Sequence, residues 1–181
     1  MEALKMEDIR YTVKDILSLP QGVRAELING EMYMMAPPSS RHQKILSEIC
    51  WKVKDYIKKK GGKCETMPAP FGVFLEENDE NYVEPDISVI CDTDKIQEDG
   101  CHGAPDWIIE IISPSSRKLD CFIKQEKYRK AGVREYWIVD PQTAVIRVYR
   151  YDKGESKDYS FSEDIPVDIY EDLKINLEVL L

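Results

Sequence analysis

The stretch from residue 106 to residue 141 constrains the fold most, because its pattern predicts a strand, a helix and a second strand. Residues 107–112 form an almost wholly apolar run, which is typical of a central strand buried on both faces. Apolar residues at helical spacing follow, with Ser115 or Ser116 as the cap and Gly132 as the stop. Residues 135–139 form a second apolar run. This order predicts a right-handed crossover between two parallel strands.

One acid, Glu110, interrupts the first of these strands. Burial of an unpaired ionised group is so unfavourable that Glu110 must be protonated, paired with a cation or bound to a metal. Asp120 and Lys124 lie four residues apart on the following helix and therefore share a face. Glu110 is thus a candidate site residue, although a buried ion pair with Lys124 is the structural alternative. We expect Asp120 to orient Lys124 or Arg117 through a charge-assisted hydrogen bond.

The N-terminal part predicts a short helix and a β-hairpin. Thr12, with Asp15 three residues later, is typical of a helix cap. Asn29-Gly30 is a strong hairpin signal and joins predicted strands at residues 24–28 and 31–35. Glu26 lies in the first of these strands. It is either a half-exposed strand residue or a side chain that points toward a shared site.

A long helix follows, which Ser40 and Gln43 cap and which ends at Gly61-Gly62. His42 lies in its first turn. We expect His42 to be exposed, unless this end of the helix faces the site and the imidazole contacts a phosphate or a metal-bound water.

Residues 71–75 and 83–90 predict neighbouring antiparallel strands. Asp86 opens the apolar part of the second strand, directly after a proline. If Asp86 and Glu110 come from adjacent strands, their carboxylates can hold a hard divalent cation and leave positions for water and a phosphate. A nearby Lys124 would stabilise the charge that develops on the phosphate oxygens. At the C-terminal end, residues 175–180 predict an edge strand or a docking segment.

Charge and composition limit the functions of the chain. Its net charge of −9 argues against broad, nonspecific affinity for nucleic acid. Basic residues gather at 52–63 and 117–130, which we interpret as solvated helix faces, with a local basic face as the alternative. The five cysteines are widely spaced without a Cys-x-x-Cys pair, so we expect reduced thiols and no structural zinc.

The chain has no apolar run near the ~20 residues that a membrane-spanning helix needs. The first eight residues also lack the pattern of a signal peptide. We therefore expect a cytoplasmic protein without membrane association. With no repeat and no linker in the sequence, we expect one α/β domain over residues 1–181.

Several motifs resemble the Uma family of restriction endonucleases, within the PD-(D/E)XK phosphodiesterase superfamily. They are Glu-Pro-Asp at residues 84–86, Pro-Asp-Trp-Ile-Ile-Glu-Ile-Ile-Ser-Pro-Ser-Ser at 105–116, Asp120, Lys124, Tyr128, and Gly-Val-Arg-Glu-Tyr-Trp-Ile-Val-Asp-Pro at 132–141. Residues 25–31 and 37–42 also fit the N-terminal part of the family. The resemblance implies a restriction-endonuclease-like fold, with a central mixed β-sheet flanked by helices.

The resemblance also implies a site and a cofactor. Asp86 and Glu110 would be metal ligands for Mg²⁺ or Mn²⁺, and Glu26 would complete the site. The superfamily pattern has a lysine two residues after the acid, where this chain has Ile112. Lys124 would then supply the amine from the following helix. His42, Asp120 and Arg117 are supporting candidates.

Three functions stay open. The first is a metal-dependent endonuclease that hydrolyses phosphodiester bonds of nucleic acid, with DNA as the expected substrate, through a metal-activated water. The second is a catalytically silent nuclease fold that serves as a binding or assembly module, which Ile112 and the net charge of −9 favour. The third is a hydrolase of small phosphate esters. A homodimer is compatible with the resemblance, because nucleases of the superfamily pair their sites to cut both strands.

Overall fold

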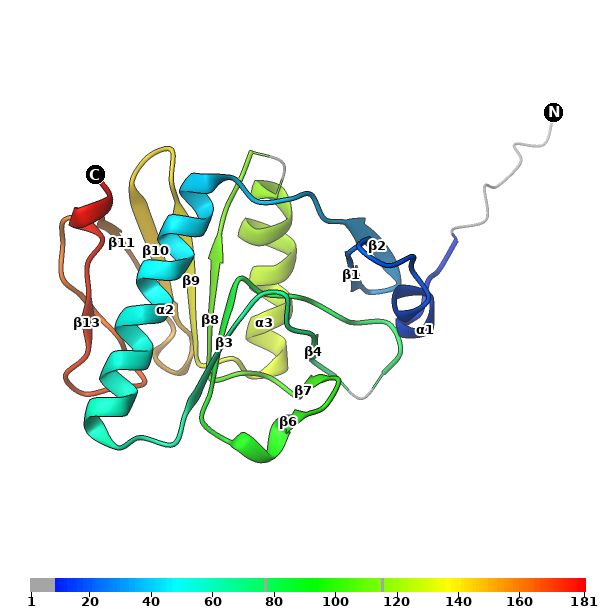
Figure 1. The fold of residues 1–181 in the computed structure, drawn as a ribbon, viewed down its shortest axis with the longest axis horizontal. Coiled ribbons are helices and arrows are strands. Elements are labelled where there is room, and N and C mark those ends of the chain that lie inside the picture. Colours follow the sequence, from blue (N-terminus) through cyan, green and yellow to red (C-terminus); the bar gives the residue numbers. More distant parts are fainter. Residues whose placement is uncertain (1–8, 77, 115) are drawn as a thin grey trace.

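The computed structural model describes residues 9–76, 78–114 and 116–181. Its centre is a six-stranded mixed sheet in the order β11-β10-β9-β8-β5-β3 (Figure 1). The pair β8-β9 is parallel, as the sequence predicts, and the other neighbours are antiparallel. The six strands are β3 (Glu65–Pro68), β5 (Ile87–Ile90), β8 (Trp107–Ile111), β9 (Glu135–Asp140), β10 (Val145–Arg150) and β11 (Glu155–Ser160).

Helices cover both faces of this sheet. The long helix α2 (Ser40–Lys60) packs on one face through a stripe of buried residues at helical spacing, Ile45, Ile49, Val53 and Ile57. The other face packs against a π-helix (Leu119–Lys124) that continues into α3 (Gln125–Ala131). The sequence predicted a single α-helix here. Its first turns are instead wound as a π-helix, a rare form that is frequent at functional sites.

The N-terminal helix and hairpin form as the sequence predicts. Helix α1 (Val13–Leu17) follows Thr12, whose backbone N–H donates to Asp15 Oδ2 at 2.7 Å. Strands β1 (Ala25–Ile28) and β2 (Glu31–Met34) pair through Asn29-Gly30, where φ is 52° and 76°. In Figure 1 these elements lie to one side of the central sheet.

Short elements complete the fold. Strands β4 (Val73–Phe74), β6 (Ile96–Gln97) and β7 (Gly100–His102) form a small sheet, and β12 (Ile165–Pro166) pairs with β13 (Lys174–Ile175). Three 3₁₀ turns cover Thr93–Lys95, Tyr151–Lys153 and Glu178–Leu180. Within the described parts of the chain, no helix is long and apolar enough to cross a membrane.

Two sequence expectations for the strands and helices are wrong. Residues 71–75 and 83–90 are not neighbouring strands, because β5 pairs with β3 and β8 and only Val73 bridges Val83. The cap of α2 is Ser39, whose side chain accepts from the His42 N–H at 3.2 Å, and not Ser40. Ser115 and the first eight residues, on which we based one helix cap and the absence of a signal peptide, lie outside the described residues.

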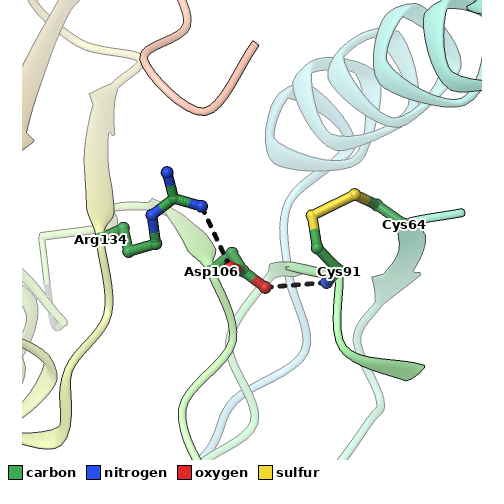
Figure 2. Close-up of a disulfide and its surroundings, with 4 residues drawn as sticks. All are labelled: Cys64, Cys91, Asp106 and Arg134. Atoms are coloured by element: carbon green, nitrogen blue, oxygen red, sulfur yellow. Dashed lines mark hydrogen bonds and ion pairs between the residues drawn. A yellow bond between two sulfur atoms is a disulfide. The ribbon is translucent and has the colours of Figure 1, made fainter. Parts of the chain in front are cut away.

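The expectation of reduced thiols is wrong for two of the five cysteines. Cys64 and Cys91 form a disulfide at the ends of strands β3 and β5 (Figure 2). The register that pairs Glu65 with Ile90 places these cysteines opposite each other, which their separation of 27 residues in sequence did not reveal. Asp106 accepts from the Cys91 N–H at 2.8 Å and pairs with Arg134 at 3.3 Å (Figure 2). The disulfide therefore belongs to a network that ties β5 to the starts of β8 and β9.

Candidate active site

Strand β8 places Glu110 on the face of the sheet that the π-helix and α3 cover. Side chains alternate along a strand, and Ile109 and Ile111 pack in the core under α2, so Glu110 points the other way. Its carboxylate is 3% exposed. Glu110 Oε1 accepts from the Tyr128 hydroxyl at 2.8 Å and from the Lys124 ammonium at 2.9 Å. The apolar strand therefore holds a carboxylate that two side chains of the following helix satisfy.

Lys124 is the centre of a buried charge cluster. Its Nζ lies 2.7 Å from Glu26 Oε2, 2.9 Å from Glu110 Oε1 and 3.2 Å from Asp120 Oδ1. All four side chains are at most about 5% exposed. Burial disfavours the ammonium, but the charges of Glu110, Glu26 and Asp120 outweigh this effect and raise the pKa of Lys124 well above its ordinary value. The lysine is therefore charged.

One ammonium cannot balance this many acids. Burial raises the pKa of Glu110 well above its ordinary value, Lys124 opposes the shift, and the carboxylates of Asp120, Asp86 and Glu26 add to it. The cluster therefore carries excess negative potential when all its acids are ionised. Such a site favours a proton or a further cation.

Asp86 joins this cluster from the start of β5. Its backbone N–H donates to Glu110 Oε2 at 3.2 Å, so the Glu110 carboxylate contacts the backbone of Asp86. Asp86 Oδ2 in turn accepts from the Ile111 N–H at 2.8 Å and pairs with His42 Nε2 at 3.1 Å. Asp86 is only partly buried, with 18% of its side chain exposed, so this edge of the cluster reaches solvent.

His42 reaches the site because the N-terminal end of α2 faces it. Burial disfavours the imidazolium, but the hydrogen bond and charge of Asp86 more than offset this effect and raise the pKa of His42. The other ring nitrogen, Nδ1, is buried and has no hydrogen-bond partner among the described residues. The first-turn histidine is therefore part of the site and not a surface residue.

The N-terminal hairpin supplies Glu26. Strand β1 is attached to the rest of the fold by a bridge between Leu27 and Tyr82, and Glu26 Oε1 accepts from the Glu84 N–H at 2.9 Å. Glu84 is held in turn by Arg24 and by the Tyr82 hydroxyl. Glu26 is 2% exposed, which excludes the half-exposed alternative from the sequence. A segment distant in sequence therefore completes the environment of Lys124.

Arg117 does not join the cluster, contrary to the sequence expectation. Its guanidinium pairs with Asp140 at the end of β9, at 2.8 Å, and 44% of its side chain is exposed. Asp120 contacts Lys124, one of the two partners that the sequence predicted for it. The π-helix explains the separation, because it turns Asp120 and Lys124 inward and leaves Arg117 at the rim.

The donor chemistry fits a hard divalent cation only in part. Among residues 9–76, 78–114 and 116–181, no three histidine, cysteine or acidic side chains are arranged as a complete metal site. Asp86 and Glu110 are nevertheless neighbouring acidic residues, and carboxylates are the ligand type that Mg²⁺ and Mn²⁺ prefer. Two protein carboxylates are enough for Mg²⁺ when water and substrate phosphates fill its other positions.

Comparison with known proteins identifies the family. The model of the Uma2 family, described as "Putative restriction endonuclease", matches residues 13–179. The chain belongs to the Uma2 family. A solved structure of a "putative nuclease belonging to DUF820" from Anabaena variabilis is similar, with a TM-score of 0.76 and 24% identity over 93% of this chain and 96% of that one. An uncharacterized protein of Synechocystis is 26% identical over 137 residues, which are 75% of this chain and 70% of that protein.

The resemblance found in the sequence is thus confirmed, and so is the restriction-endonuclease-like mixed α/β fold. The structure brings together Asp86, Glu110, Lys124, Glu26, Asp120 and His42 of the Uma2 chain. It adds Tyr128, which the sequence analysis named among the family motifs without giving it a role in the site. Tyr128 lies four residues after Lys124 and eight after Asp120, so the shared helix face was the signal for it.

Proposed function

We propose that this Uma2 protein is a Mg²⁺- or Mn²⁺-dependent endonuclease that hydrolyses phosphodiester bonds of nucleic acid, with DNA as its substrate. One observation carries the proposal. Asp86, at the partly exposed edge of the cluster, donates its backbone N–H to the buried carboxylate of Glu110 on the neighbouring strand, and Glu110 pairs with Lys124. The family supports nuclease chemistry in general, and the substrate and metal are our inference.

Asp86 and Glu110 would hold the metal ion, which supplies a Lewis acid and lowers the pKa of a water molecule when bound. Glu26 and Asp120 fix the Lys124 amine beside Glu110, so its positive charge is in place before substrate arrives. His42 keeps Asp86 Oδ2 oriented, and its buried Nδ1 has no hydrogen-bond partner among the described residues. Tyr128 fixes the other side of Glu110.

A cleavage assay on supercoiled plasmid with Mg²⁺ or Mn²⁺ tests the proposal. Asp86→Ala and Glu110→Gln are each expected to abolish cleavage while the circular dichroism spectrum stays unchanged. Glu126→Gln is the matched control, because the Glu126 side chain on α3 is 44% exposed and its ion pairs within the described residues are with Arg129 and Lys130. Nicking that survives both site variants would exclude these carboxylates from the reaction.

A specific observation favours a second candidate, a catalytically silent nuclease fold that binds nucleic acid. The lysine ammonium is fully engaged by three carboxylates, and Ile112 stands where the superfamily pattern has its lysine. Calorimetric titration of Mn²⁺ into the wild type and Glu110→Gln separates the two candidates. Binding in the wild type alone supports the endonuclease, whereas DNA binding without any Mn²⁺ binding supports the silent module.

The number of domains and the oligomeric state are also proposals. We propose one domain over residues 1–181, since the buried side chains of β8 and β9 pack in the same cores as those of α2, the π-helix and α3. We propose a homodimer in solution, which light scattering of the purified protein would test. If the protein is a monomer and still cleaves both DNA strands, the homodimer proposal is wrong.

A further inference from the structure

We propose that the outer face of α2 is the surface along which the nucleic acid leaves the active site. This face, called here the α2 outer stripe, consists of Lys44, Ser47, Trp51, Lys54 and Lys58. The inference rests on the proposed function and adds the path of the substrate to it. Residues at spacings of three and four share one side of a helix, and all five of these side chains are exposed.

Charge complementarity is the first argument. Helix α2 carries seven basic and two acidic residues, or a net charge of +5, in a chain whose net charge is −9. Its two acids are neutralised within the helix, because Glu48 pairs with Lys52 at 3.2 Å and Asp55 with Lys59 at 2.7 Å. Within the described residues, Lys44, Lys54 and Lys58 have no ion-pair partner. A row of unpaired lysines is the feature that phosphate neutralisation requires.

The exposed tryptophan is the second argument. Trp51 lies in the middle of the stripe with 61% of its surface exposed, and the Lys52 ammonium sits 5.8 Å from its ring centroid. Its exposed ring lies between unpaired lysines of the same stripe and is accessible to a planar ligand. Bases stack on aromatic side chains in proteins that bind nucleic acid without sequence preference, and lysines beside them contact the backbone.

Position relative to the active site is the third argument. The first turn of α2 carries His42, which contacts Asp86, so the helix starts at the proposed site of cleavage. Lys44 and Lys58 are fourteen residues apart, or about 21 Å along the helix axis. In Figure 1, α2 runs in front of the sheet with its outer side toward the viewer. A strand cut at Asp86 and Glu110 can therefore follow the helix over several nucleotides.

Like charges disfavour a second copy of the chain as the occupant of this face. In a twofold dimer centred on Trp51, the Lys44, Lys54 and Lys58 side chains of one protomer would meet those of the other. Juxtaposed like charges oppose association, whereas a polyanion neutralises them. The observations therefore favour nucleic acid.

Fluorescence anisotropy with labelled DNA, single-stranded and duplex, in the presence of EDTA tests the proposal without cleavage. The variant Lys44→Ala/Lys54→Ala/Lys58→Ala is compared with Lys130→Ala/Lys157→Ala/Lys174→Ala, which removes three exposed lysines elsewhere. The stripe variant is expected to bind at least about tenfold more weakly, with the slope of log K against log salt reduced by about 2. The control is expected to match the wild type. Trp51→Ala should lose about fivefold, and Trp51→Phe should retain most of the affinity.

The outcomes separate this inference from the proposed function. Equal losses in the two triple variants, or none in the stripe variant, would overturn the assignment of the α2 outer stripe even if the wild type cleaves DNA. Conversely, loss of binding in the stripe variant supports the surface even if Asp86→Ala leaves cleavage unchanged, which would contradict the proposed function alone. If Trp51→Ala dissociates a dimer and leaves DNA binding intact, the face is a protein interface and the inference fails.

Discussion

Glu110 and Glu135 are buried carboxylates on two neighbouring strands of the central sheet, and they differ in their partners. Glu110, on β8, accepts from a lysine ammonium, a tyrosine hydroxyl and one backbone N–H. Glu135, at the start of β9, accepts from Trp137 Nε1 at 2.7 Å and from the Asp168 and Ile169 N–H groups at 2.7 and 3.3 Å. The side chains point to opposite faces of the sheet, since Trp137 packs under α2 and Tyr128 under the other face.

The contrast separates a carboxylate that neutral donors satisfy from one that we propose to be reactive. The three donors of Glu135 are neutral, and they fasten the segment at residues 168–169 to the sheet. Glu110 instead shares a single lysine with Glu26 and Asp120 and touches Asp86, so charge is left uncompensated around it. Burial alone does not mark a site. A surplus of negative charge next to a solvent-exposed edge is the better indicator of a candidate site.

The largest expected difference between the two carboxylates is in catalysis. Glu110→Gln should reduce plasmid cleavage at least about a hundredfold, because an amide is a poor metal ligand and no longer balances Lys124. Glu135→Gln should retain the wild-type rate per folded molecule. Cleavage rates are to be normalised to the folded fraction measured by circular dichroism. Equal losses in both variants would mean that Glu110 acts only through the fold.

The next largest effect is the loss of stability expected when Lys124 is replaced. Lys124→Met removes the one lysine that, within the described residues, contacts Glu26, Glu110 and Asp120, so the free energy of unfolding should fall by about 3–5 kcal/mol above neutral pH. Urea denaturation measures this loss. Lys130→Met is the control, because Lys130 is exposed and pairs only with Glu126, and no measurable change is expected. A fully stable Lys124→Met protein would show that the cluster is neutral without the lysine.

A comparable effect, dependent on pH, is expected at Glu135. Burial raises the pKa of Glu135 from 4.5 to about 7, although its hydrogen bonds and Arg150 oppose the shift. A raised folded-state pKa means that stability is fully present below pH 4.5 and is lost as the pH rises toward 7. The loss is up to about 3 kcal/mol. The free energy of unfolding, measured by urea denaturation at several pH values across this range, should fall less steeply with pH for Glu135→Gln than for the wild type. Equal pH dependence in the two proteins would show that folding does not shift the pKa of Glu135.

The sequence predicted the core of the fold because local signals there agree with the tertiary structure. The apolar run at 107–112, the Gly132 stop and the Asn29-Gly30 turn each specify a backbone conformation without help from distant residues. Asp86, Glu110 and Lys124 were found because a buried acid needs a partner and a family motif supplied the positions.

The remaining features depend on contacts that no local pattern encodes. Cys64 and Cys91 became partners through the register of β3 and β5, and Glu26 reached the site only because β1 bridges to Tyr82. Arg117 was misplaced because the π-helix changes which residues face inward. Glu135 could not be recognised as buried and satisfied, since two of its three donors come from residues 168–169, far along the chain.

The smallest predicted effect concerns Tyr128. It tests whether the Tyr128 hydrogen bond affects metal binding or only stabilises the fold. Tyr128→Phe removes the hydroxyl that donates to Glu110, and Tyr151→Phe removes one that donates to the Gln125 carbonyl on α3. Both should lower the free energy of unfolding by about 1–2 kcal/mol. Only Tyr128→Phe should weaken Mn²⁺ binding, by about tenfold, because partners of a ligating carboxylate fix its orientation. If both variants bind Mn²⁺ equally well by calorimetry, Tyr128 supports the fold in the same way as the donors of Glu135.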